Sequence, residues 1–463
     1  MKFKYLISGL GAFMLFLASC TKQLELKDPQ GLSPEDAIAN DANIKKLLQG
    51  GYDAMSSANM YGGNAQLFAD FLGADGELYF VGTFNTYREI WGKQILTTNP
   101  LVTNTWGAGY DAINIANTVL ENINKVNEDD SATVKGEALF IRASMHFELV
   151  RFYAKDYSDG NPSTNPGVPL MLKSTRNSEQ VTKPSRATVK AVYDQVIADL
   201  LEAEELLPTS NGVFATASAA AGMLSRVYLQ KGDYAGARDA ANRAIQYAED
   251  EGKELLPDFM NNFNQTVNTA EDIFAMQVSD QDGDNNLQLF YSVDIFGGRD
   301  GDIEIDQSHL DLYEPNDARV TETDEPDETT VFNTAFYYIY GAYRTNKWRN
   351  LYKNVKVMRL AELYLTRAEA NFRLGTTVGA DPLDDVNMIR ERAGLDPWES
   401  IETVEDIYLE RRRELAFEGF GIHDARRFKR SIDGKAWNDN SFVFPIPFRE
   451  RNANPNLTQN PGY

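Results

Sequence analysis

Aromatic side chains gather beside amide and basic groups in two parts of the chain, a combination that could bind sugars. Residues 78–91 (LYFVGTFNTYREIW) place aromatic rings around Asn85 and Arg88, and residues 280–348 form a second such stretch. A ring can stack on the apolar C–H face of a sugar, while amide and guanidinium groups hydrogen-bond its hydroxyls. The ligand-binding residues that we expect are Tyr79, Phe80, Asn85, Tyr87, Arg88, Trp91, Tyr291 and Trp348.

The alternative is that these aromatics belong to the core, as aromatic side chains often do. Residues 336–340 (FYYIY) are typical of a buried or half-buried strand, and we expect no binding residue there. Trp91 and Trp348 are stronger candidates, because each lies close to Arg, Lys or Asn in a segment without clear periodicity.

Catalytic patterns are missing from the sequence. The histidines, His146, His309 and His423, are scattered and show no metal-ligand spacing, and the single cysteine is Cys20. Pairs of carboxylates carry no information, because 68 acidic residues make such pairs inevitable. We therefore expect a protein that is not an enzyme and has no cofactor.

Calcium is a minor alternative for two acidic runs. Asp280, Asp282 and Asp284 alternate, as do the acids of residues 300–306. Neither run has the Gly and Glu that a calcium loop carries at its sixth and twelfth positions. A solvated loop is the simpler expectation.

The N-terminus has the pattern of a secretory signal. Lys2 and Lys4 precede an apolar run, residues 6–17, that is too short to span a bilayer. The following L-A-S-C resembles a bacterial lipobox, in which Cys20 would be lipidated after removal of residues 1–19. Multiple acyl chains on one residue would anchor the protein stably in a membrane.

Composition bears on possible binding partners and on the number of domains. The formal net charge of −23 makes nucleic-acid binding improbable. Without a Gly/Ser-rich or Pro-rich linker, residues 20–463 are expected to form a single unit that is mainly α-helical with a few short strands. Its expected parts are a helical repeat body (about 33–60, 105–255 and 350–430), long irregular ligand-site inserts (about 61–104 and 256–349) and an extended tail (440–463).

The helical body shows start signals and one clear repeat. A first helix is expected to open at Ser33 with Pro34 at its first position. Residues 217–249 have the spacing of a tetratricopeptide helix pair with a turn at Gly232 and Asp233. Such a pair cannot bury its own face, so several must stack. Degenerate partners are expected at 110–154 and 358–393.

The C-terminus is rich in proline and asparagine and has no helical or strand period. The apolar residues Ile446, Phe448, Leu457 and Tyr463 suggest that residues 445–463 drape over a finished surface.

This ending resembles the SusD/RagB family of outer-membrane nutrient-binding lipoproteins, of which P-I-P, the following Glu450, N-P-N and a terminal Q-N-P-G-Y are hallmarks. Residues 357–430 are also close to the family's phrases. There, Arg411, Arg412, Glu414 and Glu418 are expected to form buried or half-buried pairs that lock the helices.

The resemblance implies a right-handed helical body of tetratricopeptide-like pairs and a function in nutrient capture. The protein would sit on the outer membrane, facing outside, and pass oligosaccharides to a SusC-like TonB-dependent transporter. Two alternatives remain, namely the same role with peptide cargo and a tetratricopeptide scaffold without a small-molecule site.

Overall fold

The computed structural model describes residues 35–281, 285–320 and 334–463. The longer helices are α2 (Asp41–Ser56), α3 (Asn64–Gly73), α5 (Pro100–Glu121), α6 (Glu128–Tyr153), α7 (Val189–Leu206), α8 (Ala217–Lys231), α9 (Tyr234–Asp250), α12 (Leu360–Leu374), α13 (Pro382–Arg392) and α14 (Val404–Glu414). The shorter helices are α4 (Asn85–Trp91), α10 (Asn286–Tyr291), α11 (Gln307–Leu310), α15 (Gly421–Arg427) and α16 (Phe448–Ala453). The strands are β1 (Leu78–Phe80), β2 (Asp272–Met276), β3 (Ile303–Ile305), β4 (Phe336–Ile339), β5 (Ala342–Thr345) and β6 (Val355–Arg359).

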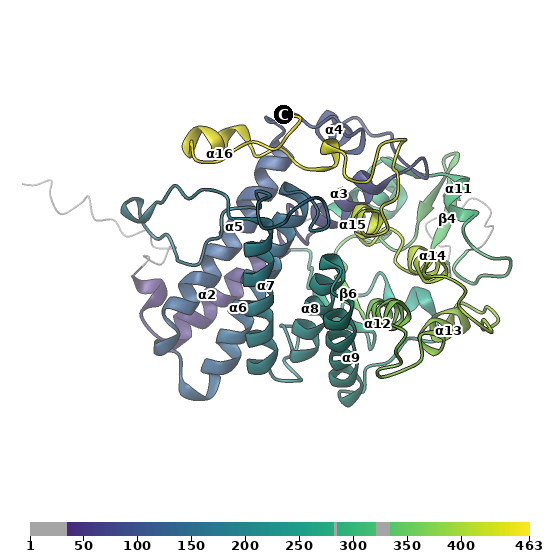
Figure 1. Cartoon of the computed structure of the whole chain (residues 1–463), viewed down its shortest axis with the longest axis horizontal. Coiled ribbons are helices and arrows are strands. Elements are labelled where there is room, and N and C mark those ends of the chain that lie inside the picture. Colours follow the sequence, from purple (N-terminus) through teal and green to yellow (C-terminus); the bar gives the residue numbers. More distant parts are fainter. Residues whose placement is uncertain (1–34, 282–284, 321–333) are drawn as a thin grey trace, which may run out of the picture.

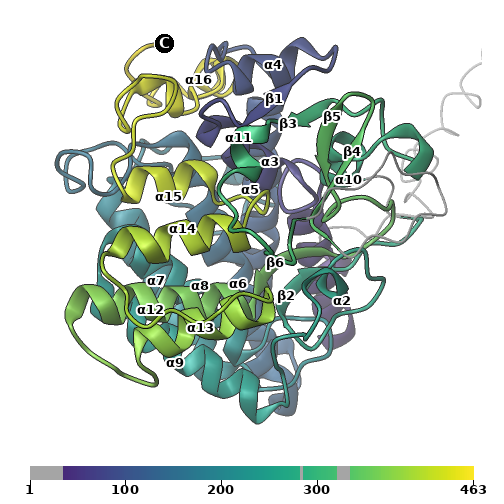
Figure 2. The same cartoon turned by 90° about the vertical axis from the view of Figure 1, so that its right-hand side faces the viewer.

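The fold is mainly helical, and successive helices lie side by side. From α5 to α9 each helix packs on the next, and α9 then packs on α12 (Figure 1). Turned by 90°, α12, α13 and α14 form a second group beside α15 (Figure 2). One hydrophobic cluster, with residues from Ile44 to Leu457, reaches α12, and a separate cluster of α12, α13 and α14 residues forms the core of the second group.

The predicted tetratricopeptide pair is confirmed as α8 and α9. Gly232 between them is left-handed with φ 77°, and the side chain of Asp233 caps α9 by accepting from the backbone N–H of Gly236. A Cβ on Gly236 would lie 2.8 Å from the ring of Tyr228, so a small residue is required where the helices meet. The pairs expected at 110–154 and 358–393 are also present, as α5 with α6 and α12 with α13.

The expected helix start at Ser33 and Pro34 lies outside the described residues, within which a 3-10 helix spans Asp36–Ile38 and α2 begins at Asp41, where Asn40 caps it. One prediction of local structure is wrong. Residues 61–104 were expected to be irregular, yet they contain α3 and α4. Every residue of α3 from Asn64 to Leu72 is buried, so the helix lacks the polar face that would have revealed its period.

The two inserts meet in one antiparallel sheet with the strand order β1-β3-β5-β4. Tyr79 of the first insert lies opposite Glu304 of the second, and Tyr338 lies opposite Tyr343. A separate pair, β2 and β6, leads from the second insert into α12. Segments more than 200 residues apart in the chain therefore share one framework.

The C-terminal tail covers the helices as expected, although part of it is helical. Ile446 and Leu457 are buried, and the side-chain amide of Asn460 donates to the carbonyls of Tyr153 and Phe444. Phe448 is 52% exposed and begins α16, so it is not the anchor that the sequence suggested.

The predicted pairs of the α14 region are confirmed. Arg411 donates to Asp424 at 2.8 Å, and Arg359 of β6 donates to Glu414 at 3.0 Å and to Glu418 at 2.8 Å. Arg412 pairs with Glu77 of the first insert. These bonds tie the helical body to the sheet.

Candidate functional site

Both inserts contribute exposed rings around α4. The Arg299 guanidinium lies 4.4 Å from the centre of the Phe84 ring, and the Arg299 Nε donates to Asp302 at 2.7 Å. Phe84, which caps α4 at its N-terminus, is 42% exposed. The loop before α4 is thus fixed against residues of the second insert, and an aromatic ring beside a cation is left facing solvent.

The turn between β4 and β5 carries a second exposed ring. Tyr340 and Gly341 both have positive φ, as a two-residue hairpin turn of type I′ requires. The Tyr340 hydroxyl donates to Asp294 at 2.8 Å, and its ring remains 52% exposed. Asp294 belongs to the same insert as Arg299 and lies five residues before it in the chain.

At the other end of α4, Tyr79 and Trp91 lie with their ring centres 6.1 Å apart. The indole N–H of Trp91 donates to the Leu78 carbonyl at 2.9 Å and leaves the ring half-buried. We call the whole region the aromatic surface, defined by Tyr79, Phe84, Asn85, Arg88, Trp91, Arg299 and Tyr340.

Four of the expected binding residues are buried and offer no ring face to a ligand. Trp348 lies in the core and donates its indole N–H to the Phe417 carbonyl at 2.7 Å, and the Tyr291 hydroxyl donates to Asp70. Phe80 and Tyr87 are covered by Phe290, which packs 4.3 Å from the ring of Tyr87.

The buried rings support the aromatic surface from below. The Tyr87 hydroxyl donates to Asn64 at 3.2 Å, and burial raises the pKa of Tyr87 to about 12. Because Tyr87 also contacts Phe84, these rings hold the start of α4 in place. Their expected role is therefore corrected from contact with ligand to positioning.

Sequence reasoning did not select Phe84, Arg299 or Tyr340. Gly341, between the aromatic-rich runs at 336–340 and 342–345, is a turn signal and could have marked Tyr340 as exposed. The contact between Phe84 and Arg299 joins distant segments, and no local pattern indicates it.

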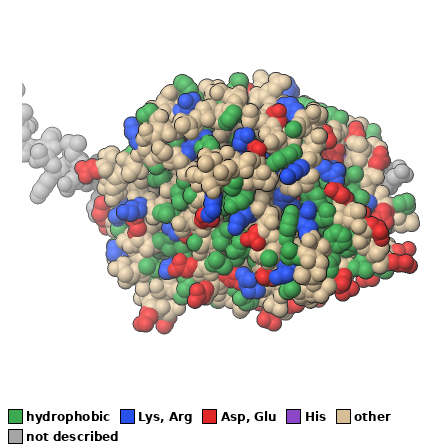
Figure 3. All heavy atoms as spheres, in the orientation of Figure 1, with side chains coloured by type: hydrophobic (Ala, Val, Ile, Leu, Met, Phe, Trp, Pro, Cys, Tyr) green, Lys and Arg blue, Asp and Glu red, His purple; other side chains and the backbone are tan. Residues whose placement is uncertain are grey.

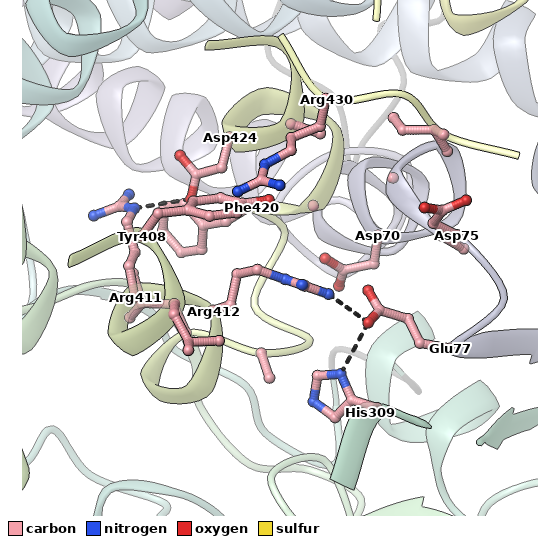
Figure 4. A pocket seen from close by; sticks show the side chains of 18 of the residues that line it. Asp70, Asp75, Glu77, His309, Tyr408, Arg411, Arg412, Phe420, Asp424 and Arg430 are labelled. Carbon is pink, nitrogen blue, oxygen red and sulfur yellow. Dashed lines mark hydrogen bonds and ion pairs between the residues drawn. The ribbon is translucent and has the colours of Figure 1, made fainter. Parts of the chain in front are cut away.

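Beside β1 lies a cavity of about 640 Å³, which we call the α14–α15 cavity (Figure 4). Asp70 comes from α3, Glu77 from the residue before β1, His309 from α11 and Arg412 from α14. Burial alone would raise the pKa of Glu77, but the hydrogen bond with His309 and the neighbouring Arg412 hold it at about 2. Burial raises the pKa of Asp70 to about 7.

A second cavity of about 760 Å³ lies between α5, residues 169–184 and α16. Its lining is rich in amides, such as Asn104 and Asn114, and includes Tyr110. Several of these amides are already used within the protein. Asn114, for example, exchanges two hydrogen bonds with the backbone of Thr175.

Comparison with known proteins gives the family. A model described as "Starch-binding associating with outer membrane" matches residues 22–229, and the SusD family model matches residues 313–441. The SusD-like protein P2 of Formosa agariphila is 26% identical over 99% of this chain and 100% of its own length. This chain belongs to the SusD/RagB family.

Two further relatives are informative. The starch-binding protein SusD of Bacteroides thetaiotaomicron is 34% identical over 128 residues, which is 24% of this chain and 22% of that protein. The crystal structure of a SusD superfamily protein from the same organism aligns with a TM-score of 0.78 at 25% identity, covering 91% of this chain and all of that one. The fold of this SusD/RagB family member is therefore shared across almost its whole length.

The described residues of this family member were searched for metal-binding clusters and for membrane-spanning helices. Within them, no three His, Cys, Asp or Glu side chains are placed to hold a metal ion, while Asp282 and Asp284 lie outside those ranges. No helix within the same ranges is both long and apolar enough to cross a membrane. Cys20 also lies outside them. On the face seen in Figure 3, hydrophobic side chains are scattered among polar ones.

Proposed function

We propose that this chain is a lipid-anchored outer-membrane protein that captures oligosaccharides and delivers them to a TonB-dependent transporter. One observation carries the proposal, namely that the two inserts join in a single sheet and present the aromatic surface. The exposed Phe84 ring lies against Arg299 and is followed by Asn85, and the exposed Tyr340 hydrogen-bonds to Asp294 of the second insert. This pairing of apolar ring faces with geometric donors is what sugars require.

The family supports the location and the partner. One matching family model is described as starch-binding and associated with the outer membrane, and the relative SusD is named as a starch-binding protein. Cys20 would provide the lipid anchor, leaving residues 20–463 as one SusD-like unit. Tethering keeps the capture site close to a transporter, so modest affinity suffices.

The positions and contacts of the three histidines fit a binding function without catalysis. His146, His309 and His423 lie on different helices, and burial lowers the pKa of each. His146 hydrogen-bonds to the Arg142 carbonyl and His309 to Glu77, which are contacts within the protein. We therefore propose that captured oligosaccharides leave the protein unchanged.

Glycan and peptide arrays probed with the full-length protein in detergent test the cargo. We expect binding to a set of related oligosaccharides, no binding to peptides, and no cleavage of a labelled glycan that binds. Peptide binding alone would move the cargo to peptides, and binding to neither would favour the scaffold alternative. Cleavage would contradict the proposal that the protein is not an enzyme.

Purification of the tagged protein from outer membranes tests the partner. A TonB-dependent transporter should co-purify, and the Cys20→Ala variant should lose membrane retention. Recovery of the wild-type protein alone, after mild cross-linking, would contradict delivery to a transporter.

A further inference from the structure

The α14–α15 cavity has an imbalance between hydrogen-bond donors and acceptors. Each arginine in its lining already has a carboxylate partner. Arg411 pairs with Asp424 at 2.8 Å, Arg412 pairs with Glu77, and Arg430 pairs with Glu405. The strongest donors of the cavity are therefore occupied by the protein itself.

One acceptor in the same cavity is not satisfied. The Asp70 carboxylate, on a side chain that is almost fully buried, has hydrogen-bond donors in the backbone N–H groups of Gly419 and Gly421 and in the Tyr291 hydroxyl, but no cationic partner within the described ranges. The His309 Nδ1 lies 3.4 Å from Glu77 and so carries the proton. The Nε2 of His309 is then an acceptor, and it has no hydrogen-bond partner among the described residues although the side chain is only 4% exposed. An unsatisfied buried acceptor is costly, and a ligand donor would relieve that cost.

The charges of the lining also favour a cationic ligand. Besides the three paired carboxylates, Asp70, Asp75 and Asp406 line the cavity without an arginine or lysine ion-pair partner among the described residues. An anionic ligand would meet this excess of acid and find each arginine already engaged. A metal ion is disfavoured because the described residues offer no set of three ligands.

The remaining walls are partly apolar. Tyr408, Phe420 and aliphatic side chains line the cavity, and the volume of about 640 Å³ lies in the range of small-molecule sites. Arg411 and Arg226 lie over the ring of Phe420, and Phe428 and Arg430 lie over that of Tyr408, so these ring faces are used within the protein. In Figure 4 Asp70 and His309 lie on the side of Glu77, and Phe420 lies across the cavity near Asp424. A buried carboxylate and an acceptor without a partner among the described residues thus border one space.

We propose that the α14–α15 cavity is a second ligand site that binds a small amino sugar, with its ammonium group beside Asp70 and a hydroxyl donating to Nε2 of His309. The ammonium group would be the positively charged partner that the buried Asp70 carboxylate does not have within the described residues. The site is distinct from the aromatic surface, and the inference does not depend on the proposed function.

Calorimetric titration of the full-length protein in detergent tests this site. Glucosamine should bind, whereas glucose and N-acetylglucosamine, which lack the ammonium group, should bind at least about tenfold more weakly, as expected for loss of a charge-assisted bond. Asp70→Asn should weaken glucosamine binding by a similar factor. Asp111→Asn on α5 makes the same charge change outside this cavity and should leave the affinity unchanged.

A second variant tests the site independently, in case Asp70→Asn impairs folding. Leu409 is half-buried on the cavity wall, and Leu409→Trp should fill the space and abolish glucosamine binding without changing any charge. The double variant Phe84→Ala, Tyr340→Ala should bind glucosamine normally, which separates this site from the aromatic surface. Equal binding of the three sugars, absence of glucosamine binding, or binding that survives both Asp70→Asn and Leu409→Trp would overturn the proposal.

Discussion

Arginine and aromatic side chains meet in two regions of this protein with opposite outcomes. At the aromatic surface, Arg299 and Phe84 contact each other and stay partly exposed. In the interior, Arg359 and Lys347 lie over Phe263 and are fully buried. The same pairing of residue types is available to a ligand in one region and closed off in the other.

The interior region is an ion-pair network, which we call the buried charge network. Arg359 is held by Glu414 and Glu418, and Lys347 donates to Glu418 at 2.7 Å and to the carbonyls of Glu414 and Ala416. It also includes Arg319, Arg392, Arg413, Glu271, Glu410 and Asp317. Burial makes each charge dependent on its partners, so this region should control stability and the aromatic surface should control binding.

The largest effect is expected from breaking the buried charge network. Glu414→Ala leaves Arg319, Arg359 and Arg392 short of a partner and should lower the free energy of unfolding by about 3–5 kcal/mol. Denaturant unfolding measures this loss. Glu405→Ala, which removes an exposed partner of Arg430, is the matched control and should cost less than about 1 kcal/mol. Equal losses of unfolding free energy in Glu414→Ala and Glu405→Ala would show that burial does not make the buried charge network more important for stability than an exposed ion pair.

Trp348 sharpens the comparison, because sequence reasoning placed it in the binding site. Trp348→Ala should create a cavity and lower the free energy of unfolding by about 3–5 kcal/mol. Phe84→Ala, at an exposed ring, should change it by less than about 1 kcal/mol. Thermal and denaturant unfolding of both variants provide the test, and a stable Trp348→Ala would contradict its assignment to the core.

A pH-dependent effect is expected at Asp70. Burial raises the pKa of its carboxyl to about 7 despite hydrogen bonds from Gly421, Gly419 and Tyr291, and the nearby Glu418 adds to the rise. In the unfolded chain an Asp titrates near about 3.9. The folded state therefore binds more protons between about pH 4 and pH 7, and the free energy of unfolding falls as the pH rises through this window.

Asp70→Asn should remove that dependence, which amounts to a few kcal/mol at most because one pKa unit corresponds to about 1.4 kcal/mol. Denaturant unfolding at several pH values compares the two proteins. Parallel curves for wild type and Asp70→Asn would show that Asp70 does not titrate in this range.

The helical body could be predicted from the sequence because its signals are local. The α8–α9 pair is marked in the sequence by small residues in register and by the Gly232-Asp233 turn. In contrast, α3 is buried on all sides and shows no period.

The site could be predicted only in part. The insert at 78–91 does carry exposed aromatics, but which rings face solvent depends on distant partners. Phe290 covers Tyr87, whereas Phe84 is held by Arg299. The α14–α15 cavity joins residues as far apart as Asp70 and His309, so no spacing along the chain could reveal it.

The smallest effects are expected from single changes at the edge of the aromatic surface. Tyr79→Ala should weaken glycan binding by about threefold to tenfold, since one stacked ring contributes on the order of 1 kcal/mol. Titration with an array-selected glycan gives the affinity. An unchanged affinity would restrict the site to the Phe84 and Tyr340 end of α4.

The most direct test of the comparison is the glycan affinity of the double variant Phe84→Ala, Tyr340→Ala, measured beside Phe448→Ala, which removes a similarly exposed ring on α16. The double variant should stay as stable as the wild type and lose glycan binding by about tenfold or more, while Phe448→Ala binds normally. Glycan binding that survives in a folded double variant would contradict the assignment of capture to the aromatic surface.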